Sequence, residues 1–299
     1  MNNSCALCPR RCGADRSVTR GRCGALSEIE VSKIMLHVWE EPPISGSDKN
    51  RGSGAVFFTH CPLGCIYCQN GKISHTLSSG RIYTPEELAD EMLSLEEKGA
   101  YNVNFVSPTQ YTDRISEAVH IAREKGLSIP TVWNTGGYEL PETIEKLDGT
   151  VDIFLTDFKY ASKELSDLYS SAPDYLDYAT LSLKAMHRIT GPVVLDENGM
   201  MKKGVIVRHL VLPSHKDDSM LVLRKIAEAV PPDEILLSLM AQYTPEFLPP
   251  AADGDRYKKI RRKITTYEYD AVREEAVHLG LDGFMQERSS ATSRFTPDF

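Results

Sequence analysis

The stretch GAVFFTHCPLGCIYCQN, residues 54–70, combines an apolar run with three closely spaced cysteines. Its part over residues 56–60 is rich in β-branched and aromatic side chains, which is typical of a buried strand. Cys61, Cys65 and Cys68 follow directly in the spacing Cys-x-x-x-Cys-x-x-Cys. Because functional side chains of parallel α/β domains gather at the carboxyl ends of strands, the stretch predicts a core strand with a site at its end.

Beyond this stretch, short apolar runs alternate with segments of helical period, the pattern of a parallel α/β domain. Thr84-Pro85-Glu86-Glu87 offers a cap, a first-turn proline and acidic residues, so a helix begins there, and a second helix ends at Gly126. Asp196-Glu197-Asn198-Gly199 predicts a hairpin turn before the fifth strand. The expected strands are residues 56–60, 103–106, 131–134, 153–157, 205–211 and 235–240. The helical stripes lie at Leu88, Met92 and Leu95; at Ile115, Val119 and Ala122; over residues 140–147; at Leu176, Leu183 and Met186; at Leu223, Ile226 and Val230; and at Val272, Ala276 and Leu279.

Six successive strand and helix units predict an α/β fold, namely a partial (β/α)6 TIM-like barrel that falls short of the closed eight-unit form. We assign residues 51–299 to this domain. Residues 1–50 precede the first unit and carry four of the seven cysteines. We expect them to form a small N-terminal metal-binding extension.

The composition is that of an ordinary globular protein, with 41% hydrophobic and 25% charged residues. The net charge of -8 disfavours nucleic acid or an anionic membrane as partner, because both need a clustered positive field. The basic run over residues 258–263 is expected to be a solvated helix face. No apolar run approaches the roughly 20 residues that cross a bilayer, and the N-terminus is polar. We therefore expect a cytoplasmic protein whose cysteines serve as metal ligands rather than disulfides.

Three thiolates suit three corners of an iron–sulfur cubane and leave one iron open to a reacting molecule. The alternative is a zinc site or a purely structural cluster, but tetrahedral zinc requires a fourth ligand. His60 lies next to Cys61 and is the available candidate. A lone histidine at a strand end is more often a packing or hydrogen-bonding residue, so we assign it no metal.

The motif CPLGCIYCQN, residues 61–70, resembles the signature of the radical S-adenosylmethionine (SAM) superfamily, including the aromatic Tyr67 before the third cysteine. The resemblance implies the radical SAM type of partial barrel and an oxidoreductase with a 4Fe-4S cluster on the catalytic Cys61, Cys65 and Cys68. It implies that the open iron chelates SAM and that an electron from a flavodoxin- or ferredoxin-type donor cleaves it. The 5′-deoxyadenosyl radical then abstracts a substrate hydrogen.

More narrowly, the whole chain resembles the pyruvate formate-lyase activating enzymes and their uncharacterised relatives. This resemblance implies a glycyl radical enzyme as partner, activated by hydrogen abstraction from a glycine. Chemistry transfers between relatives better than substrate does, so radical modification of a peptide or small metabolite is an alternative. A non-catalytic iron–sulfur or zinc binding module is the alternative of another class.

Polar residues at the other strand ends support the resemblance. Asp157 and Lys159 lie two residues apart, so both point to one face, either as an ion pair or toward a ligand. By resemblance, Lys159 pairs with the methionine carboxylate of SAM. Arg208 and His209 point to opposite faces, and the resemblance favours Arg208 as a cofactor contact, with a salt bridge as the alternative. Asn134 replaces an acidic residue that helps to hold a monovalent cation in the family.

The largest departure from the family follows the second strand. Ser107-Pro108-Thr109-Gln110 replaces the Gly-Gly-Glu segment that receives the SAM amino group in many relatives, and its oxygens can still accept from an ammonium. Gln242 and Tyr243 are weaker candidates after the sixth strand. The residues expected to bind the cofactor are Tyr67, Ser107, Thr109, Asn134, Thr135, Asp157, Lys159, Arg208 and Gln242.

The remaining cysteines are Cys5, Cys8, Cys12 and Cys23. Four thiols with none left over can close a zinc site or ligate a second iron–sulfur cluster, and their spacing does not decide between the two. Four unliganded thiols are the alternative, although an arm with few apolar residues needs a metal to fold. This arm resembles the cysteine-rich start of the uncharacterised branch near the activating enzymes.

Overall fold

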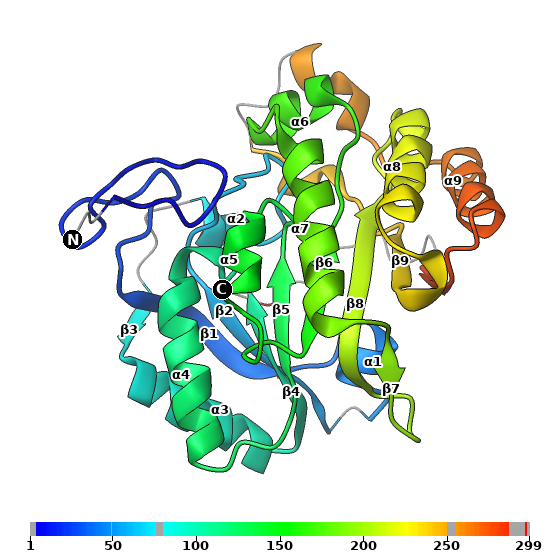
Figure 1. The fold of residues 1–299 in the computed structure, drawn as a ribbon. Helices are drawn as coiled ribbons and strands as arrows, with labels where there is room; N and C mark the ends of the chain where they lie inside the picture. The colour runs from blue at the N-terminus through cyan, green and yellow to red at the C-terminus, as the bar shows by residue number, and fades with distance from the viewer. Residues whose placement is uncertain (1–3, 49, 76–79, 250–254, 287–296, 298–299) are drawn as a thin grey trace.

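The chain folds around one open, mostly parallel sheet (Figure 1). The computed structural model describes residues 4–48, 50–75, 80–249, 255–286 and 297. Within these residues the strands follow the order β10-β9-β8-β6-β5-β4-β2-β1-β3, and β7 pairs with β8 beside this path. The order runs from β10 to β3 without closing on itself, which confirms the predicted α/β partial barrel.

The six predicted strands are all present and pair in parallel with their neighbours. They differ from the expected ranges only at their ends. A seventh parallel strand, β10, was not predicted because it has only three residues. The strands are β2 (Gly52–Phe58), β4 (Ala100–Val106), β5 (Thr131–Thr135), β6 (Ile153–Asp157), β8 (Met201–Leu210), β9 (Leu236–Met240) and β10 (Gly283–Met285).

Two antiparallel strands extend the sheet beyond β2. Strand β1 (Ile29–His37) pairs with β2, and β3 (Arg81–Tyr83) pairs with β1. Strand β1 lies within the predicted extension over residues 1–50, so the part of that extension before it carries the four cysteines but contributes no strand to the sheet. The predicted hairpin is confirmed, because β7 (Val194–Leu195) runs antiparallel to β8.

The helices cover the outer face of the sheet from α3 and α4 to α8 and α9 (Figure 1). Helix α3 begins at the predicted place, where Thr84 and Glu87 form a capping box. Helix α6 was not predicted, because its eight residues include few apolar ones. The helices are α1 (Pro42–Ser45), α2 (Gly71–Ser74), α3 (Pro85–Glu97), α4 (Thr112–Glu124), α5 (Pro141–Glu145), α6 (Lys163–Ser170), α7 (Tyr175–Thr190), α8 (Lys216–Ala229) and α9 (Thr266–His278).

Alternation along the strands separates the core into two layers. Phe154 of β6 packs in the main core beneath the helices, whereas Ile153 and Leu155 join a second cluster on the concave face. Ile44 of α1 closes this second cluster. The amino-terminal half of the concave face is therefore filled, by apolar side chains on β5, β6 and β8 and by the buried Asn102 on β4, whose amide donates to the carbonyl of Ile44, so the carboxyl ends of the strands are left for a site.

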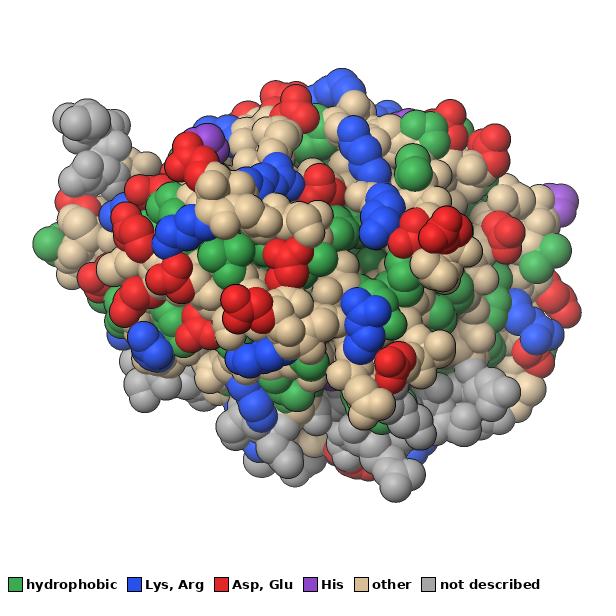
Figure 2. All heavy atoms as spheres, turned by 90° about the horizontal axis from the view of Figure 1, so that it is seen from below, with side chains coloured by type: hydrophobic (Ala, Val, Ile, Leu, Met, Phe, Trp, Pro, Cys, Tyr) green, Lys and Arg blue, Asp and Glu red, His purple; other side chains and the backbone are tan. Residues whose placement is uncertain are grey.

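The surface carries charges of both signs. On the face shown in Figure 2, acidic and basic side chains are interspersed rather than gathered by sign. The basic side chains of residues 258–263 are exposed, as expected, but only Lys258 and Lys259 lie on a helix, a short 3-10 helix that ends at Ile260, so the predicted helix face is wrong for Arg261, Arg262 and Lys263. Among the described residues, none of the helices has the length and apolar character that crossing a membrane requires.

Candidate active site at the carboxyl ends of the strands

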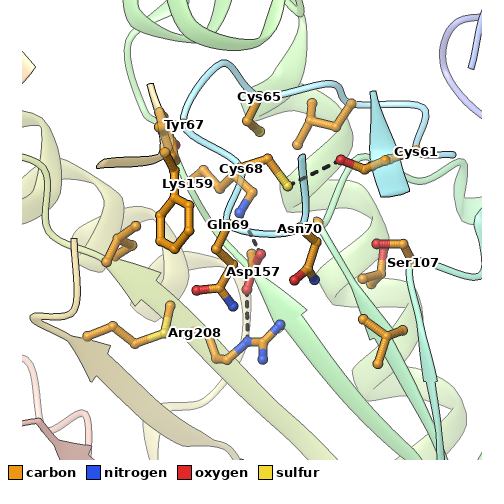
Figure 3. Close-up of a pocket in the computed structure, with 18 of the residues that line it drawn as sticks. Cys61, Cys65, Tyr67, Cys68, Gln69, Asn70, Ser107, Asp157, Lys159 and Arg208 are labelled. Carbon is orange, nitrogen blue, oxygen red and sulfur yellow. Dashed lines mark hydrogen bonds and ion pairs between the residues drawn. The ribbon is translucent and has the colours of Figure 1, made fainter. Parts of the chain in front are cut away.

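The three cysteines of the motif lie on one loop after β2 and line a common cavity (Figure 3). The loop leaves the strand through His60, whose φ of 70° is in the left-handed region. The N–H of Cys68 donates to the carbonyl of Cys65 at 3.1 Å, which folds the loop back on itself. The cavity measures about 960 Å³ with the part that is open to solvent.

Hydroxyl groups support two of these thiols. Ser170 donates to Cys65 Sγ at 3.0 Å, and Ser74 donates to Cys68 Sγ at 3.4 Å. Burial raises the pKa of Cys61 to about 12 and also raises that of Cys68. Such thiols ionise only when a cation compensates the charge, and bound iron would supply that charge.

The geometry of the thiols is not that of a site for a single ion. Among the residues that the structure describes, no group of three or more His, Cys, Asp or Glu side chains converges to hold one metal ion. In a cubane each thiolate binds a different iron, so its three cysteines need not converge on one point. The three thiols around one cavity, with hydroxyl donors behind them, fit a cluster of this kind.

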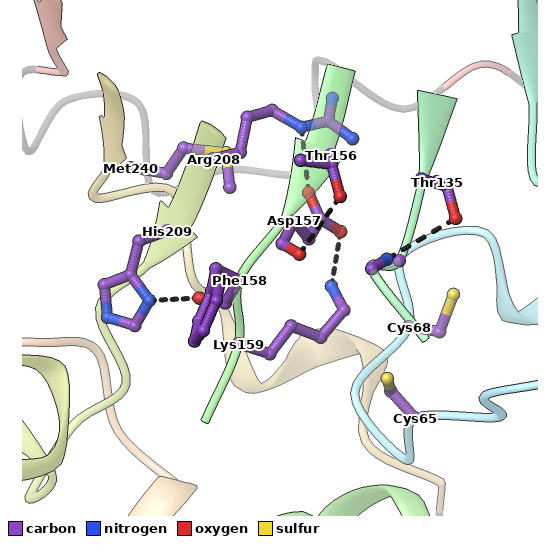
Figure 4. Close-up of polar contacts among 12 residues, drawn as sticks. Cys65, Cys68, Thr135, Thr156, Asp157, Phe158, Lys159, Arg208, His209 and Met240 are labelled. Atoms are coloured by element: carbon purple, nitrogen blue, oxygen red, sulfur yellow. Dashed lines mark hydrogen bonds and ion pairs between the residues drawn. The ribbon is translucent and has the colours of Figure 1, made fainter. Parts of the chain in front are cut away.

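Asp157, Lys159 and Arg208 form the opposite wall of the cavity (Figures 3 and 4). Lys159 Nζ lies 2.5 Å from Asp157 Oδ2, and Arg208 Nε lies 2.8 Å from Asp157 Oδ1. Asp157 and Arg208 are paired in register across β6 and β8. Asp157 has the strand parity of Ile153 and Leu155, which places its side chain on the concave face.

Burial alone would raise the pKa of Asp157, but Arg208 and Lys159 outweigh it and hold the pKa below its usual range. Burial would likewise lower the pKa of Lys159, and Asp157 reverses that shift, so its pKa is raised. All three groups are therefore charged at neutral pH. The predicted pair of Asp157 and Lys159 is thus a buried ion pair that also lines the cavity.

The prediction for strand five is also resolved by the structure. Arg208 points into the cavity, whereas His209 is buried on the other face and its ring bonds the carbonyl of Phe158 (Figure 4). Arg208 donates to Asn134 Oδ1 at 2.6 Å and lies 3.3 Å from Glu40 Oε2. Glu40 was not predicted, because it follows β1, a strand that the sequence pattern did not indicate.

Tyr67 lines the cavity and begins a chain of hydroxyl groups. Its hydroxyl lies 2.6 Å from that of Tyr160, which in turn lies 2.8 Å from Ser170 Oγ. Since Ser170 donates to Cys65, the chain connects the aromatic residue of the motif to one of its thiols.

Most of the other expected residues also lie in the cavity wall. Ser107, Asn134, Thr135 and Gln242 line it, as does Tyr243. The N–H of Ser107 donates to the carbonyl of Asn134 at 2.9 Å, which joins two strand ends.

Thr109 is the exception and requires a correction. It is not among the residues that line this cavity. Its hydroxyl donates instead to Glu139 Oε1 at 2.7 Å, because the short helix that begins at Thr109 turns it away. Thr135 bonds the same oxygen. Glu139 was missed, since an isolated glutamate carries no sequence signal; burial raises its pKa to about 7.

The N-terminal cysteines line a smaller cavity on the outer side of the motif loop. Cys5, Cys8, Cys12 and Cys23 all contribute to its wall, together with Thr109 and other residues. A Cβ atom on Gly21 would lie 3.5 Å from Cys23 Sγ and 3.6 Å from Cys12 Sγ, which are ordinary contact distances, so Gly21 lies directly beside both thiols. Burial raises the pKa of Cys8 to about 12 and that of Cys23 as well. The four cysteines therefore line one small space, but in the described structure their side chains do not converge on a point where one metal ion could sit.

Arg10 connects this cysteine arm to the motif loop. Its guanidinium donates to the carbonyls of Pro62 at 3.0 Å and Leu63 at 3.2 Å, both between Cys61 and Cys65. It also donates to the carbonyls of Ser170, at 2.8 Å, and Ser171. The Arg10 side chain thus fixes the position of the motif loop relative to the end of α6.

We expect Arg10→Ala to lower the free energy of unfolding by about 2–3 kcal/mol, because hydrogen bonds from a charged group are each worth roughly 1.5–3 kcal/mol. Iron retained after anaerobic reconstitution should fall as well, since the loop loses its support. Arg10→Lys should recover only part of the stability and of the retained iron, because an ammonium cannot donate to several carbonyls at once as the planar guanidinium does. Denaturant unfolding and iron analysis measure these effects.

Arg11→Ala is the matched control, because the exposed pair between Arg11 and Glu142 is expected to contribute less than about 1 kcal/mol. Equal stability and iron content in the Arg10→Ala and Arg11→Ala variants would contradict a clamping role for Arg10.

Comparison with known proteins supports the interpretation of the motif cysteines as ligands of an iron–sulfur cluster. The model of the family described as "Radical SAM superfamily" matches residues 55–227, more than half of the chain. An uncharacterised protein of Methanocaldococcus jannaschii is 30% identical over 289 residues, which cover 93% of this chain and 76% of that protein.

Similar solved structures include methylornithine synthase, with a TM-score of 0.48 and 15% identity over 74% of this chain and 60% of that one. The carboxyl transferase domain of Rhizobium etli pyruvate carboxylase has a TM-score of 0.31 and 11% identity over 69% of this chain and 33% of that one. This chain therefore spans less than two thirds of either structure's length.

Proposed function

This chain belongs to the radical SAM superfamily, and from that premise we propose that it cleaves SAM reductively and abstracts hydrogen from a substrate. The observation that carries the proposal is the shared cavity: the thiols of Cys61, Cys65 and Cys68 face the same space as Lys159 and Arg208. A cluster on the thiols and a carboxylate on the cations would be neighbours there.

When bound, a 4Fe-4S cluster supplies the electron that breaks the sulfonium–C5′ bond of SAM, giving methionine and the 5′-deoxyadenosyl radical that takes a hydrogen atom from substrate. A flavodoxin- or ferredoxin-type protein is the proposed electron donor. The protein's own side chains bind SAM and orient it. Lys159 offers a charge to the methionine carboxylate while Asp157 holds the Lys159 ammonium in place. Leu63, Met240 and Phe247 make part of the wall apolar and exclude water.

The proposal extends to a partner protein. By resemblance to the pyruvate formate-lyase activating enzymes, the hydrogen is taken from a glycine of a glycyl radical enzyme. Radical modification of a peptide or small metabolite is the alternative, and the open sheet is compatible with both. A cytoplasmic location accords with such partners and with an oxygen-labile cluster.

Anaerobic incubation with dithionite and SAM tests the function. We expect 5′-deoxyadenosine to form in amounts that exceed the cluster-free protein by at least about 100-fold, a difference of about 2.7 kcal/mol in barrier. A candidate glycyl radical enzyme is added in a second arm, where a glycyl signal in electron paramagnetic resonance would support activation. Cleavage without that signal would reject activation, and a reduced, cluster-loaded protein that leaves SAM intact would reject the function.

The N-terminal cysteines are proposed to bind a second metal. Counting iron, sulfide and zinc in the reconstituted protein should give about four irons with one zinc, or about eight irons for a second cluster. The variant with Cys5→Ala and Cys8→Ala should lose the zinc or the additional irons and keep four. About four irons without zinc in the unmodified protein would contradict a metal in this arm.

A further inference from the structure

A second cavity adjoins the first at the carboxyl ends of the strands. The two share wall residues, among them Gln69, Asn70, Asn134 and Arg208. Figure 3 shows Gln69 and Asn70 beside Asp157 and Arg208, and of these four residues all except Asp157 line both cavities. With the part that is open to solvent, the second cavity measures about 780 Å³. A group bound in it would lie next to the space assigned to SAM.

Acidic side chains outnumber basic ones among the described residues in the wall of this cavity. Glu40 and Glu41 both line it, and Arg208 is the cation that faces them. Arg208 is shared with Asp157, while the ammonium of Lys159 is turned to Asp157 on the side of the first cavity. Among the described residues of this region, three carboxyl groups thus share two cations, Arg208 and Lys159.

Glu41 is the carboxylate that keeps an unpaired oxygen, although Ser238 bonds the carboxylate and Arg208 attracts it. Only 9% of its surface is exposed, and its Oε2 atom has no hydrogen-bond partner among the described residues. Burial raises the pKa of Glu41, and neighbouring Glu40 adds to the shift, although Arg208 opposes it. A buried carboxylate in this state gains most from a ligand that brings both a positive charge and a hydrogen-bond donor.

Other groups in the wall suit the same kind of ligand. Asn70 Oδ1 is a buried acceptor without a partner in the described part of the chain. Burial lowers the pKa of His37 to about 4, so this imidazole is neutral and does not repel a cation. Trp39, which is 58% exposed, lines the cavity with Phe57 and Phe284, and aromatic faces attract cations.

We propose that this second cavity binds the protonated amino or guanidino group of an organic substrate, with Glu41 as its counter-charge and Trp39 at its rim. The inference rests on the proposed function, because it names the substrate class for the radical formed in the adjoining cavity. A basic side chain of a peptide and a small amine share this chemistry.

Calorimetry with n-butylammonium chloride as the probe tests the site on the anaerobically reconstituted full chain. Butyramide serves as the neutral probe, and KCl and MgCl2 at equal ionic strength serve as inorganic cations. Of the four probes, we expect only n-butylammonium to bind. Its Kd should be at least about tenfold higher in Glu41→Gln than in the unmodified protein, a loss of about 1.4 kcal/mol in binding free energy. Glu97→Gln, an exposed carboxylate on α3, should change the Kd less than about twofold.

Trp39→Ala provides a second variant that does not alter the buried charges, and it should weaken binding about threefold or more, because it removes an aromatic face from the cavity wall. Absent binding, equal binding of butyramide, an unchanged Kd in Glu41→Gln, or equal heats from KCl or MgCl2 would each overturn the inference. SAM cleavage by the same preparation separates the two proposals. SAM cleavage without amine binding rejects only the amine site. Amine binding without SAM cleavage rejects the proposed function.

Discussion

Replacing Cys65 with alanine is expected to reduce SAM cleavage by at least about 10³-fold, a barrier increase of about 4 kcal/mol. Cys65 is the buried member of the three thiols and receives the hydrogen bond from Ser170. Without it a cubane would keep only two protein ligands and would be lost or inactive. The measurements are 5′-deoxyadenosine formation under anaerobic reduction and the iron content of the reconstituted protein.

The matched control is Cys5→Ala, which removes a thiol from the other cysteine group. This variant should keep the four irons of the motif loop, whereas Cys65→Ala should lose them. If Cys65→Ala kept its full iron content and cleaved SAM at the normal rate, the assignment of the motif cysteines would be wrong. A loss of all iron in both variants would instead mean that the arm supports the motif loop through its metal.

Replacing Asp157 with alanine is expected to lower the free energy of unfolding by about 3–5 kcal/mol, the usual result of removing one partner of a buried ion pair. Lys159 and Arg208 would then face each other without their common carboxylate. Asp157→Asn should be less damaging, since the amide oxygen still accepts one hydrogen bond. SAM affinity should fall in both variants because Lys159 loses the group that orients it.

The pH dependence gives a second check on Asp157. Its pKa is below the usual value in the folded protein, so its contribution to stability is present above the ordinary pKa of about 3.9. That contribution is lost as the pH falls through the lower, folded value. The stability difference between the unmodified protein and Asp157→Asn should therefore be constant near neutral pH and shrink below about pH 4.

Asp90→Ala is the matched surface control. The pair of Asp90 and Lys125 is exposed and should contribute less than about 1 kcal/mol. Denaturant titrations of the unmodified protein, Asp157→Ala and Asp90→Ala measure the difference in the free energy of unfolding. If Asp157→Ala were as stable as Asp90→Ala, the buried ion pairs would not hold this edge of the sheet together.

Local pattern predicted the parallel part of the fold correctly. Each of the six expected strands carries its own apolar run, and helices such as α3 carry their own caps and stripes. Strand β1 was not predicted, because its two most buried residues, Ile29 and Val31, are followed by half-buried ones. Its position depends on pairing with β2, which is an interaction between distant residues.

The candidate site could be predicted where its functional residues are near neighbours in the sequence. The cysteine motif and the pair of Asp157 and Lys159 are of this kind, and all five residues line the cavity. Thr109 was misplaced, because the turn after β4 rotates its hydroxyl toward Glu139. No spacing rule indicates the direction of a side chain in an irregular turn.

By itself, the sequence determined the alternation of strands and helices and the three thiols at the end of the first parallel strand, because both follow from residues that are neighbours in the chain. Only the tertiary structure decided that Arg10 supports the motif loop across 52 positions and that Glu40 meets Arg208 across 168. The physical reason is that these contacts depend on how strands pair and which face each side chain occupies. Those features arise only when distant segments pack together.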